Sequence, residues 1–174
     1  MLRLRLVLSD MPFTEPLPQR EENRYVDLSK KKISHCIGCF GCWVKTPGRC
    51  VIRDNATDVY PLIAKSEKIL YVSRICYGSY DTVMKTMLER AIPIQQAFIR
   101  LHNGETHHVQ RRVVPKDAVI LAYGSRSQEE RELFERLVAR NANNMLFQRW
   151  RIEFLPQSQV EAAVRREVDA WEKS

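Results

Sequence analysis

Four of the five cysteines in the sequence are clustered within 15 residues, where they could share one chemical task. They form the spacing C-x2-C-x2-C-x7-C and are Cys36, Cys39, Cys42 and Cys50. The first three positions match the compact run of thiolates that binds a four-iron, four-sulfur cluster. Gly38 and Gly41 keep the intervening loops small, so that the thiolates can converge on one centre. The gap before Cys50 is longer than in ferredoxin runs, and Val51 rather than proline follows it.

The same residues allow three other interpretations. A tetrahedral zinc site favours two C-x2-C pairs separated by a longer stretch, which this spacing does not reproduce. A redox-active thiol and a tight loop of reduced, buried cysteines without metal both remain open. The N-terminus alternates Leu and Arg and has no unbroken apolar stretch of the signal-peptide kind, so we expect a cytoplasmic protein with reduced thiols.

The elements that must position these cysteines alternate between strand and helix. Apolar patterning predicts strands over 2–8, 24–28, 69–72, 118–122 and 150–154, and helices over 55–66, 83–91, 128–138 and 158–171. Capping-box patterns at Ser127/Glu130 and Ser158/Glu161 mark the starts of the last two helices. Such alternation predicts one α/β domain over residues 1–174, with a parallel five-stranded sheet between two helical layers. Ligands of these folds bind beyond the carboxyl ends of the strands, here the loops 9–18, 73–80 and 123–127.

Two segments in register carry a family resemblance. The cysteine segment continues as Thr46-Pro-Gly-Arg-Cys-Val-Ile-Arg-Asp54, and Val72-Ser-Arg-Ile-Cys-Tyr-Gly-Ser-Tyr80 precedes Met84-Lys-Thr-Met-Leu-Glu-Arg90. Together they resemble the flavodoxin-like NAD(P)H-dependent FMN reductases, a group that includes the iron–sulfur flavoproteins. The resemblance covers roughly residues 24–155. It implies a flavodoxin-like three-layer sandwich and an FMN-dependent oxidoreductase that passes electrons from NAD(P)H to a small acceptor.

The resemblance also implies where the cofactor would sit. In that family a loop after the third strand cups the flavin ring, and a second loop forms the opposite wall. The matching positions here are Ser73, Arg74, Ile75, Cys76, Tyr77, Gly78 and Ser79 in the first loop, and Tyr123, Gly124 and Ser125 in the second. Gly78 would allow close approach to the ring, and Tyr77 could stack on it.

The loop after the first strand departs from the family pattern. Members of the family usually carry a glycine- and serine-containing loop there, which holds the FMN phosphate at the N-terminus of a long helix. Here the equivalent is Ser9-Asp10-Met11-Pro12, which lacks glycine and places a carboxylate where the phosphate would lie. The first helix is expected to be shortened or missing. That loss would expose one sheet face and favours a homodimer, or a heterodimer with another flavodoxin-like chain.

The net charge of +7 could suit nucleic acid, an anionic membrane surface or the phosphates of a nicotinamide cofactor. The motifs and the resemblance leave three classes of function open. Besides the FMN reductase, these are a non-catalytic paralogue that acts as a subunit or binding module without FMN, and an iron–sulfur electron-transfer protein. The basic residues are scattered and not interleaved with aromatic residues, so we expect no nucleic-acid partner. No apolar run reaches the roughly 20 residues of a membrane span, so we expect no membrane partner.

Overall fold

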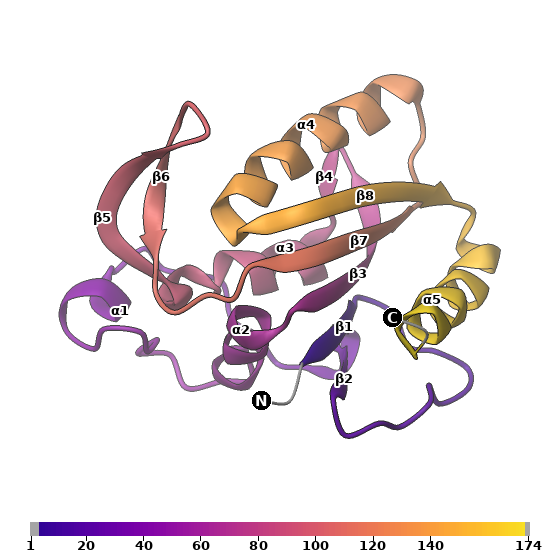
Figure 1. Cartoon of the computed structure of the whole chain (residues 1–174), viewed down its shortest axis with the longest axis horizontal. Coiled ribbons are helices and arrows are strands. Elements are labelled where there is room, and N and C mark those ends of the chain that lie inside the picture. Colours follow the sequence, from indigo (N-terminus) through magenta and orange to yellow (C-terminus); the bar gives the residue numbers. More distant parts are fainter. Residues whose placement is uncertain (1–3, 173–174) are drawn as a thin grey trace.

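A computed structural model describes residues 4–172 and shows an α/β fold with helices on both sides of a mostly parallel sheet (Figure 1). Its strands are β1 (Arg5–Ser9), β2 (Asn23–Asp27), β3 (Lys68–Cys76), β4 (Ser79–Tyr80), β5 (Gln95–His102), β6 (Glu105–Gln110), β7 (Lys116–Tyr123) and β8 (Phe147–Leu155). Its helices are α1 (Gly41–Val44), α2 (Ala56–Lys65), α3 (Thr82–Glu89), α4 (Gln128–Met145) and α5 (Gln157–Glu172), with short 3-10 turns η1 (Leu28–Lys30) and η2 (Ile92–Ile94). No helix in the described part of the chain is long and apolar enough to cross a bilayer.

Five strands form the central sheet in the order β2-β1-β3-β7-β8, and every neighbouring pair among them is parallel. This is the flavodoxin-like order, in which the chain reverses its winding direction between β1 and β3. The predicted fold class and the five parallel strands are therefore confirmed. The short β4 adds an antiparallel pair to the end of β3.

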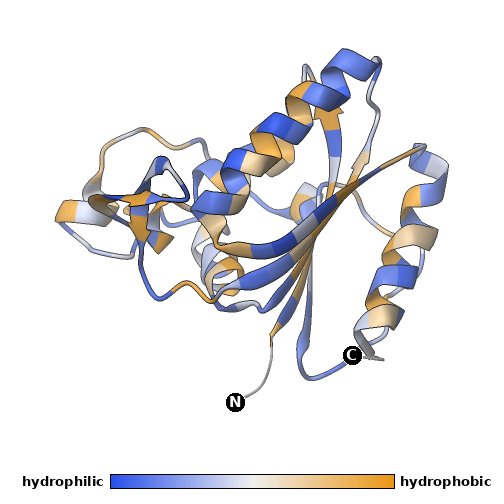
Figure 2. Ribbon diagram, turned by 45° about the horizontal axis from the view of Figure 1, so that its top comes forward, coloured by the Kyte–Doolittle hydropathy of each residue, from blue (hydrophilic) through white to orange (hydrophobic). Residues whose placement is uncertain are grey.

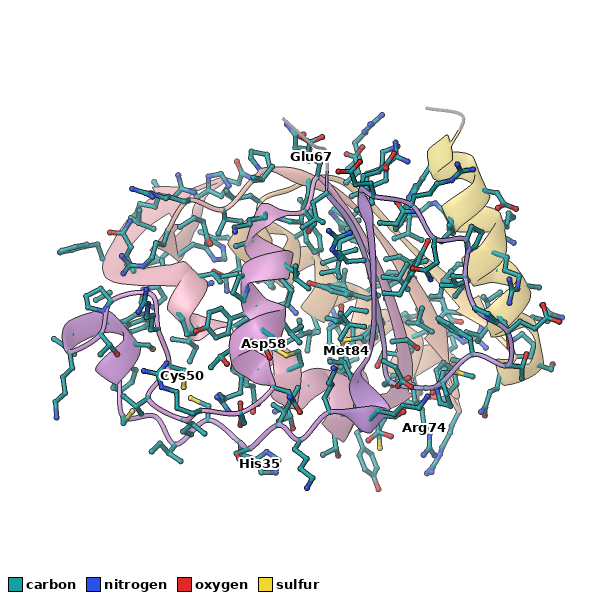
Figure 3. The ribbon with its side chains drawn as sticks, turned by 90° about the horizontal axis from the view of Figure 1, so that it is seen from below. His35, Cys50, Asp58, Glu67, Arg74 and Met84 are labelled. Atoms are coloured by element: carbon teal, nitrogen blue, oxygen red, sulfur yellow. The ribbon has the colours of Figure 1, made fainter. Side chains whose placement is uncertain are left out.

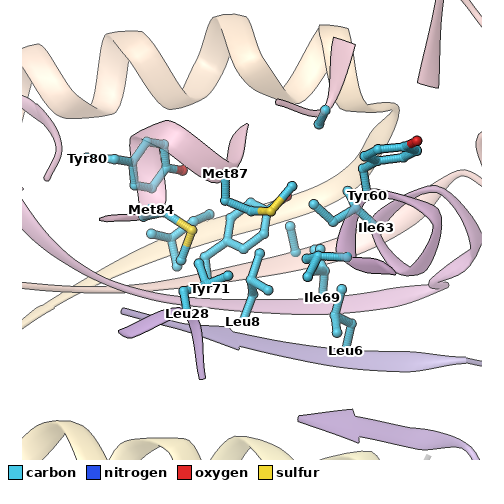
Figure 4. Close-up of a cluster of buried hydrophobic side chains, with 14 of the residues drawn as sticks. Leu6, Leu8, Leu28, Tyr60, Ile63, Ile69, Tyr71, Tyr80, Met84 and Met87 are labelled. Atoms are coloured by element: carbon cyan, nitrogen blue, oxygen red, sulfur yellow. The ribbon is translucent and has the colours of Figure 1, made fainter. Parts of the chain in front are cut away.

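The two sheet faces have separate cores. On one face α2, α3 and α4 cover residues such as Leu8, Ile69 and Tyr71, and Met84 and Met87 pack above them (Figure 4). On the other face the side chains of α5 pack against alternate strand residues, including Leu70 and Val72. This alternation follows from the two-residue period of a strand, which sends successive side chains to opposite faces. Figure 2 shows the same division as orange stripes on the helix sides that face the sheet.

The predicted absence of the first helix is confirmed, because residues 10–22 contain no helix. The prediction that this loss exposes one sheet face is wrong. Leu17 is buried against that face, and Met11 and Phe13 pack beside it. Glu161 of α5 fixes this segment by accepting hydrogen bonds from the Thr14 backbone N–H at 3.1 Å and the Glu15 N–H at 3.2 Å.

Other local predictions also needed correction. Residues 73–76, predicted as a loop, continue β3, because β7 pairs with residues 73–74 and β4 pairs with residues 75–76. The N-cap at Ser127 is confirmed, since its Oγ accepts from the Glu130 N–H at 3.2 Å. The second capping box is wrong: α5 starts at Gln157, which places Ser158 inside the helix. Leu2 lies outside the described residues.

Candidate functional site

The predicted flavin-pocket residues meet at the carboxyl ends of β3 and β7. Parallel pairing sets Ser73 beside Ala122 and Arg74 beside Tyr123, so the two predicted loops share one edge of the sheet. Arg74 lies toward the edge where β3 ends and Glu67 toward the edge where it begins (Figure 3). The described structure thus brings together the residue set 73–79 and 123–125, and it adds Asp10 from the end of β1.

Asp10 is the hydrogen-bonding centre of this edge. Its carboxylate accepts from Ser73 Oγ at 3.0 Å, the Arg74 backbone N–H at 2.7 Å and the Tyr123 hydroxyl at 2.8 Å. Burial raises the pKa of Asp10, and these three donors oppose the rise. Burial and the adjacent carboxylate likewise raise the pKa of Tyr123, which keeps its hydroxyl a donor at neutral pH.

A carboxylate from α4 accepts hydrogen bonds at the turn after β3. Tyr77 and Gly78 have φ values of +53° and +70°, a left-handed pair that joins β3 to β4. The Gly78 N–H donates to Glu130 Oε1 at 3.3 Å, and the Arg126 N–H donates to Glu130 Oε2 at 2.7 Å. These bonds, led by the one from Arg126, lower the pKa of Glu130. The Gly78 N–H is therefore held by a carboxylate at the start of α4, while the Tyr77 ring is exposed.

The remaining predicted residues form the rim of the same edge. Gly124 has a φ of +78°, and a Cβ there would lie 3.1 Å from Cγ of Arg74, so the arginine stem runs over this glycine. Arg74 also pairs with Asp81 at 3.5 Å. Ser125 Oγ accepts from Arg131 Nε at 2.9 Å. Ile75 is buried, and Cys76 is a half-buried free thiol whose partner across the turn is Ser79.

These observations test the fit of an FMN phosphate directly. The family's site requires free donors and a helix N-terminus after the first strand, whereas here residues 10–22 form no helix. The donors at this edge are already satisfied by Asp10. A phosphate placed among them would meet a carboxylate of the same sign. The residues after β1 therefore do not fit the phosphate group of FMN.

The cysteine segment forms a second, separate site between η1 and α2. Its four thiols are all free and line one small apolar hollow. The other walls of the hollow are Ile37, Gly38, Phe40, Val51, Ile52 and Ile92. Burial raises the pKa of Cys42, and the neighbouring thiols of Cys50, Cys36 and Cys39 raise it further. A cationic centre bound in this hollow would stabilise the thiolate forms of these cysteines.

Arg90 connects this segment to α3. Its guanidinium is 1% exposed and binds Asp54 through two hydrogen bonds of 2.7 and 3.0 Å. It also donates to the Ser34 carbonyl at 2.7 Å and lies 3.4 Å from the Cys50 sulfur. Burial alone would raise the pKa of Asp54, but the bonds from Arg90 and from two backbone N–H groups lower it overall. Arg90 therefore fixes both ends of the loop that carries the four cysteines.

The thiol arrangement bears on the zinc interpretation. A single tetrahedral zinc ion holds its sulfurs about 3.8 Å apart, because each Zn–S bond is about 2.3 Å. Within residues 4–172, no three His, Cys, Asp or Glu side chains are grouped tightly enough to hold one ion. The described thiols are therefore not grouped for a single zinc ion.

Sequence reasoning did not find two parts of these sites. Asp54 ends the cysteine segment and Arg90 ends the segment that begins at Met84, but nothing in the spacing shows that these two residues pair across 36 positions. The role of Glu130 was equally hidden, because its capping pattern predicts an interaction within α4 rather than with the turn after β3.

Comparisons with known proteins agree with this architecture. No protein-family model matches the chain. An iron–sulfur flavoprotein of Archaeoglobus fulgidus is 35% identical over 68 residues, which are 39% of this chain and 30% of that protein. A second iron–sulfur flavoprotein, from Methanocaldococcus jannaschii, is 29% identical over 69 residues, which are 40% of this chain and 34% of that protein. The chain thus matches only about a third of the length of these relatives.

Two solved structures share the fold over nearly the whole chain. An FMN-dependent NADH-azoreductase of Bacillus anthracis strain Ames Ancestor, in complex with FMN, has a TM-score of 0.60 at 9% identity and covers 97% of this chain and 96% of its own. An azoreductase of Bacillus anthracis strain Sterne has a TM-score of 0.56 at 11% identity and covers 97% and 93%. The predicted resemblance is therefore confirmed: the chain shares the flavodoxin-like fold of these azoreductases, and about 40% of its length is similar in sequence to iron–sulfur flavoproteins.

Proposed function

We propose that this protein is an electron-transfer oxidoreductase whose redox centre is an iron–sulfur cluster bound by Cys36, Cys39, Cys42 and Cys50. The observation that carries the proposal is the convergence of these four thiols on one apolar hollow. Bound there, a cluster would supply one-electron transfer. Electrons would reach it from a separate NAD(P)H-dependent flavoprotein, since the FMN phosphate does not fit after β1.

The protein's own residues contribute position and environment. Arg90 holds Asp54 and the carbonyl groups of Ser34 and Ile52, which fixes the backbone on either side of the cysteines. Its guanidinium lies 3.4 Å from the Cys50 sulfur and would complement the net negative charge of a cluster bound by four cysteines. Cys36 and Cys39 are exposed, so a cluster bound here would be partly hydrated, and hydration and hydrogen bonding tune a cluster's potential.

Anaerobic purification followed by iron and acid-labile sulfide analysis tests this proposal. About four iron atoms and four sulfides per chain, with an EPR signal after reduction, are expected for a single cluster. The variant Cys42→Ser should lose most of the iron, whereas Cys76→Ser, at the fifth cysteine, should retain it. Absence of both iron and sulfide from protein reconstituted without air would refute the proposal.

A second candidate is the FMN-dependent NAD(P)H oxidoreductase that reduces a small acceptor. The left-handed Tyr77–Gly78 turn favours it, because it occupies the position of the family's ring-binding loop. In this candidate Tyr77, Gly78, Ser79 and Gly124 would contact the ring. Incubation with excess FMN, desalting and a visible spectrum distinguish the candidates: a retained two-banded flavin spectrum supports the FMN enzyme, and a spectrum without flavin bands supports a protein that does not bind FMN.

A further inference from the structure

A cavity lies between the last turns of α3 and α4, on the sheet face that these helices cover. It forms because α3 ends at Glu89, where the 3-10 turn η2 with Pro93 near its start follows, whereas α4 continues to Met145. The first residue of β5, Gln95, also lines the space beside the end of α4. The volume of the cavity is about 160 Å³. An apolar cavity of about 150 Å³ is large enough for one benzene-sized molecule.

Tyr71 of β3 lines this cavity from the sheet and carries an unsatisfied polar group. Its side chain is 2% exposed, and its buried hydroxyl has no hydrogen-bond partner within residues 4–172. Burial raises the pKa of Tyr71, so the hydroxyl stays protonated and keeps its donor. Buried hydroxyls without a partner are rare, because each one costs stability. An oxygen atom of a ligand that accepted a hydrogen bond from Tyr71 would remove this cost.

Three aromatic rings surround the same space. The centroid of the Tyr71 ring lies 6.2 Å from that of Tyr80, at an interplanar angle of 86°, and 6.3 Å from that of Phe147, at 52°. Tyr71 and Tyr80 lie among the buried side chains of this face (Figure 4). Aromatic rings attract one another in edge-to-face and offset arrangements at such separations. A planar ring bound among Tyr71, Tyr80 and Phe147 would extend this set, so the walls favour an aromatic ligand.

The described residues that line the cavity carry no charge at neutral pH. Apolar side chains such as Leu88 and Met145 form part of the walls, and the amides of Gln95, Asn141 and Asn144 supply the other polar groups. An ionised ligand would place its charge in a partly buried site without a counter-charge, which is costly. The lining therefore selects a neutral molecule.

The elements around the cavity are fixed to one another, so the site is preformed. The end of α4 is bound to β6, because Gln110 Nε2 donates to the Asn144 carbonyl, and Asn144 Oδ1 lies 3.2 Å from His107 Nδ1. The Lys116 N–H donates to the Leu146 carbonyl at 3.0 Å and thereby joins the residue after α4 to β7. A site whose walls are already in place loses little conformational freedom when a ligand enters, which favours binding.

We propose that this cavity, which we call the Tyr71 cavity, binds a small neutral aromatic carbonyl compound. The ring of the ligand would pack against Tyr80 and Phe147, and its carbonyl oxygen, an uncharged acceptor, would take the hydrogen bond of the Tyr71 hydroxyl. None of residues 73–79 and 123–125 lines this cavity, so it is separate from the predicted flavin pocket. Ile92 lines both the Tyr71 cavity and the cysteine hollow, so the ligand would lie beside the hollow without contacting a cysteine.

Isothermal titration calorimetry with acetophenone, which carries one aromatic ring and one carbonyl group, is the first test. We expect a dissociation constant of about 1 mM or lower, as is usual for a ligand of this size in a preformed site. Tyr71→Phe removes only the hydroxyl and should raise that constant about tenfold. The matched probe is α-methylstyrene, in which a CH2 group replaces the carbonyl oxygen, and its dissociation constant should change by less than about twofold. No binding of acetophenone at about 10 mM, the result for a cavity that holds only water, would overturn the proposal, as would equal effects of Tyr71→Phe on both probes.

Variants that fill the cavity test the location independently. Ala91 is 4% exposed and lines the cavity, so Ala91→Met should abolish the binding of both probes, whereas Ala97→Met, on the exposed part of β5, should leave it unchanged. Circular dichroism and thermal unfolding establish that each variant is folded. If Ala91→Met does not fold, Leu88→Trp, at a half-buried wall residue, serves the same purpose. Unchanged binding in a folded variant that fills the cavity would refute the site. Because no cysteine lines the cavity, these outcomes do not depend on whether a cluster is bound.

Discussion

Replacing Asp10 with Asn should convert the end of β1 from a site that repels the FMN phosphate into one that tolerates it. In the wild type the carboxylate holds three donors, at 3.0 Å from Ser73 Oγ, 2.7 Å from the Arg74 N–H and 2.8 Å from the Tyr123 hydroxyl. A phosphate that reached the same donors would lie within about 5 Å of that carboxylate. The phosphate of FMN carries a charge close to −2 at neutral pH.

The size of the effect follows from Coulomb's law. Charges of −1 and −2 at about 5 Å repel by roughly 3–7 kcal/mol for an effective dielectric constant of about 20–40. The lower value applies here, because this edge of the sheet is partly open to solvent, and it corresponds to about a hundredfold in the dissociation constant. Asp10→Asn should therefore tighten FMN binding about a hundredfold. Riboflavin, which lacks the phosphate, should change by less than about threefold.

Flavin fluorescence titrations of the two proteins measure this difference. Asp169→Asn, which removes an exposed carboxylate from α5, serves as the control and should alter neither dissociation constant. A wild-type protein that binds FMN at least tenfold more tightly than riboflavin would refute the reasoning, since it would show that Asp10 moves aside or that the phosphate binds elsewhere.

Three further outcomes follow from contacts described above. Arg90→Met should lower the free energy of unfolding in urea by about 3–5 kcal/mol, because it leaves Asp54 as an uncompensated and largely buried charge; a loss below about 1 kcal/mol would contradict this. Gly78→Ala should cost about 2 kcal/mol in the free energy of unfolding, because its φ is +70° and the new Cβ would lie 2.5 Å from Leu133 Cδ2. The added change Leu133→Ala should relieve only part of the steric cost, because the Leu133 Cβ that alanine keeps would still lie 2.8 Å away. The pKa of Asp10 is raised above its ordinary 3.8. The stability of the wild type relative to Asp10→Asn should therefore be highest below pH 3.8 and should fall as the pH rises through the raised pKa. Urea unfolding of both proteins over a pH series measures this difference, and parallel pH profiles would disprove it.

The sequence predicts the framework well because the framework depends on local patterns. The buried strands around Ile69 and Ala118 are short apolar runs, and the cap at Ser127 is a contact between residues three apart. The missing first helix was equally visible, since prolines after β1 exclude it. What covers the sheet in its place depends on Leu17 packing against strands that are distant in sequence, which no local pattern encodes.

The candidate sites were predicted less completely, because their decisive contacts are long-range. Asp10 was recognised as a residue that would repel phosphate, but its three donors lie 63–113 positions away. Ser158 and Glu161 satisfy the capping-box pattern, yet Glu161 binds Thr14 instead. The β5–β6 hairpin also has a readable signal in Asn103-Gly104, because this pair is a strong two-residue turn sequence.

Residues 10–22, which replace the first helix, should also unfold locally without the rest of the fold. Residues 10–22 have no helical hydrogen-bond ladder, and much of their attachment depends on one carboxylate, that of Glu161. Hydrogen bonds from Thr14, assisted by Glu15 and Arg165, lower the pKa of Glu161 to about 2, so this attachment is present above the ordinary value of 4.5 and is lost as the pH falls toward 2. Amide hydrogen exchange should therefore be fast here while β3 and β7 remain protected. In acid, residues 10–22 should be the first part of the fold that a protease can cut, before the sheet itself unfolds.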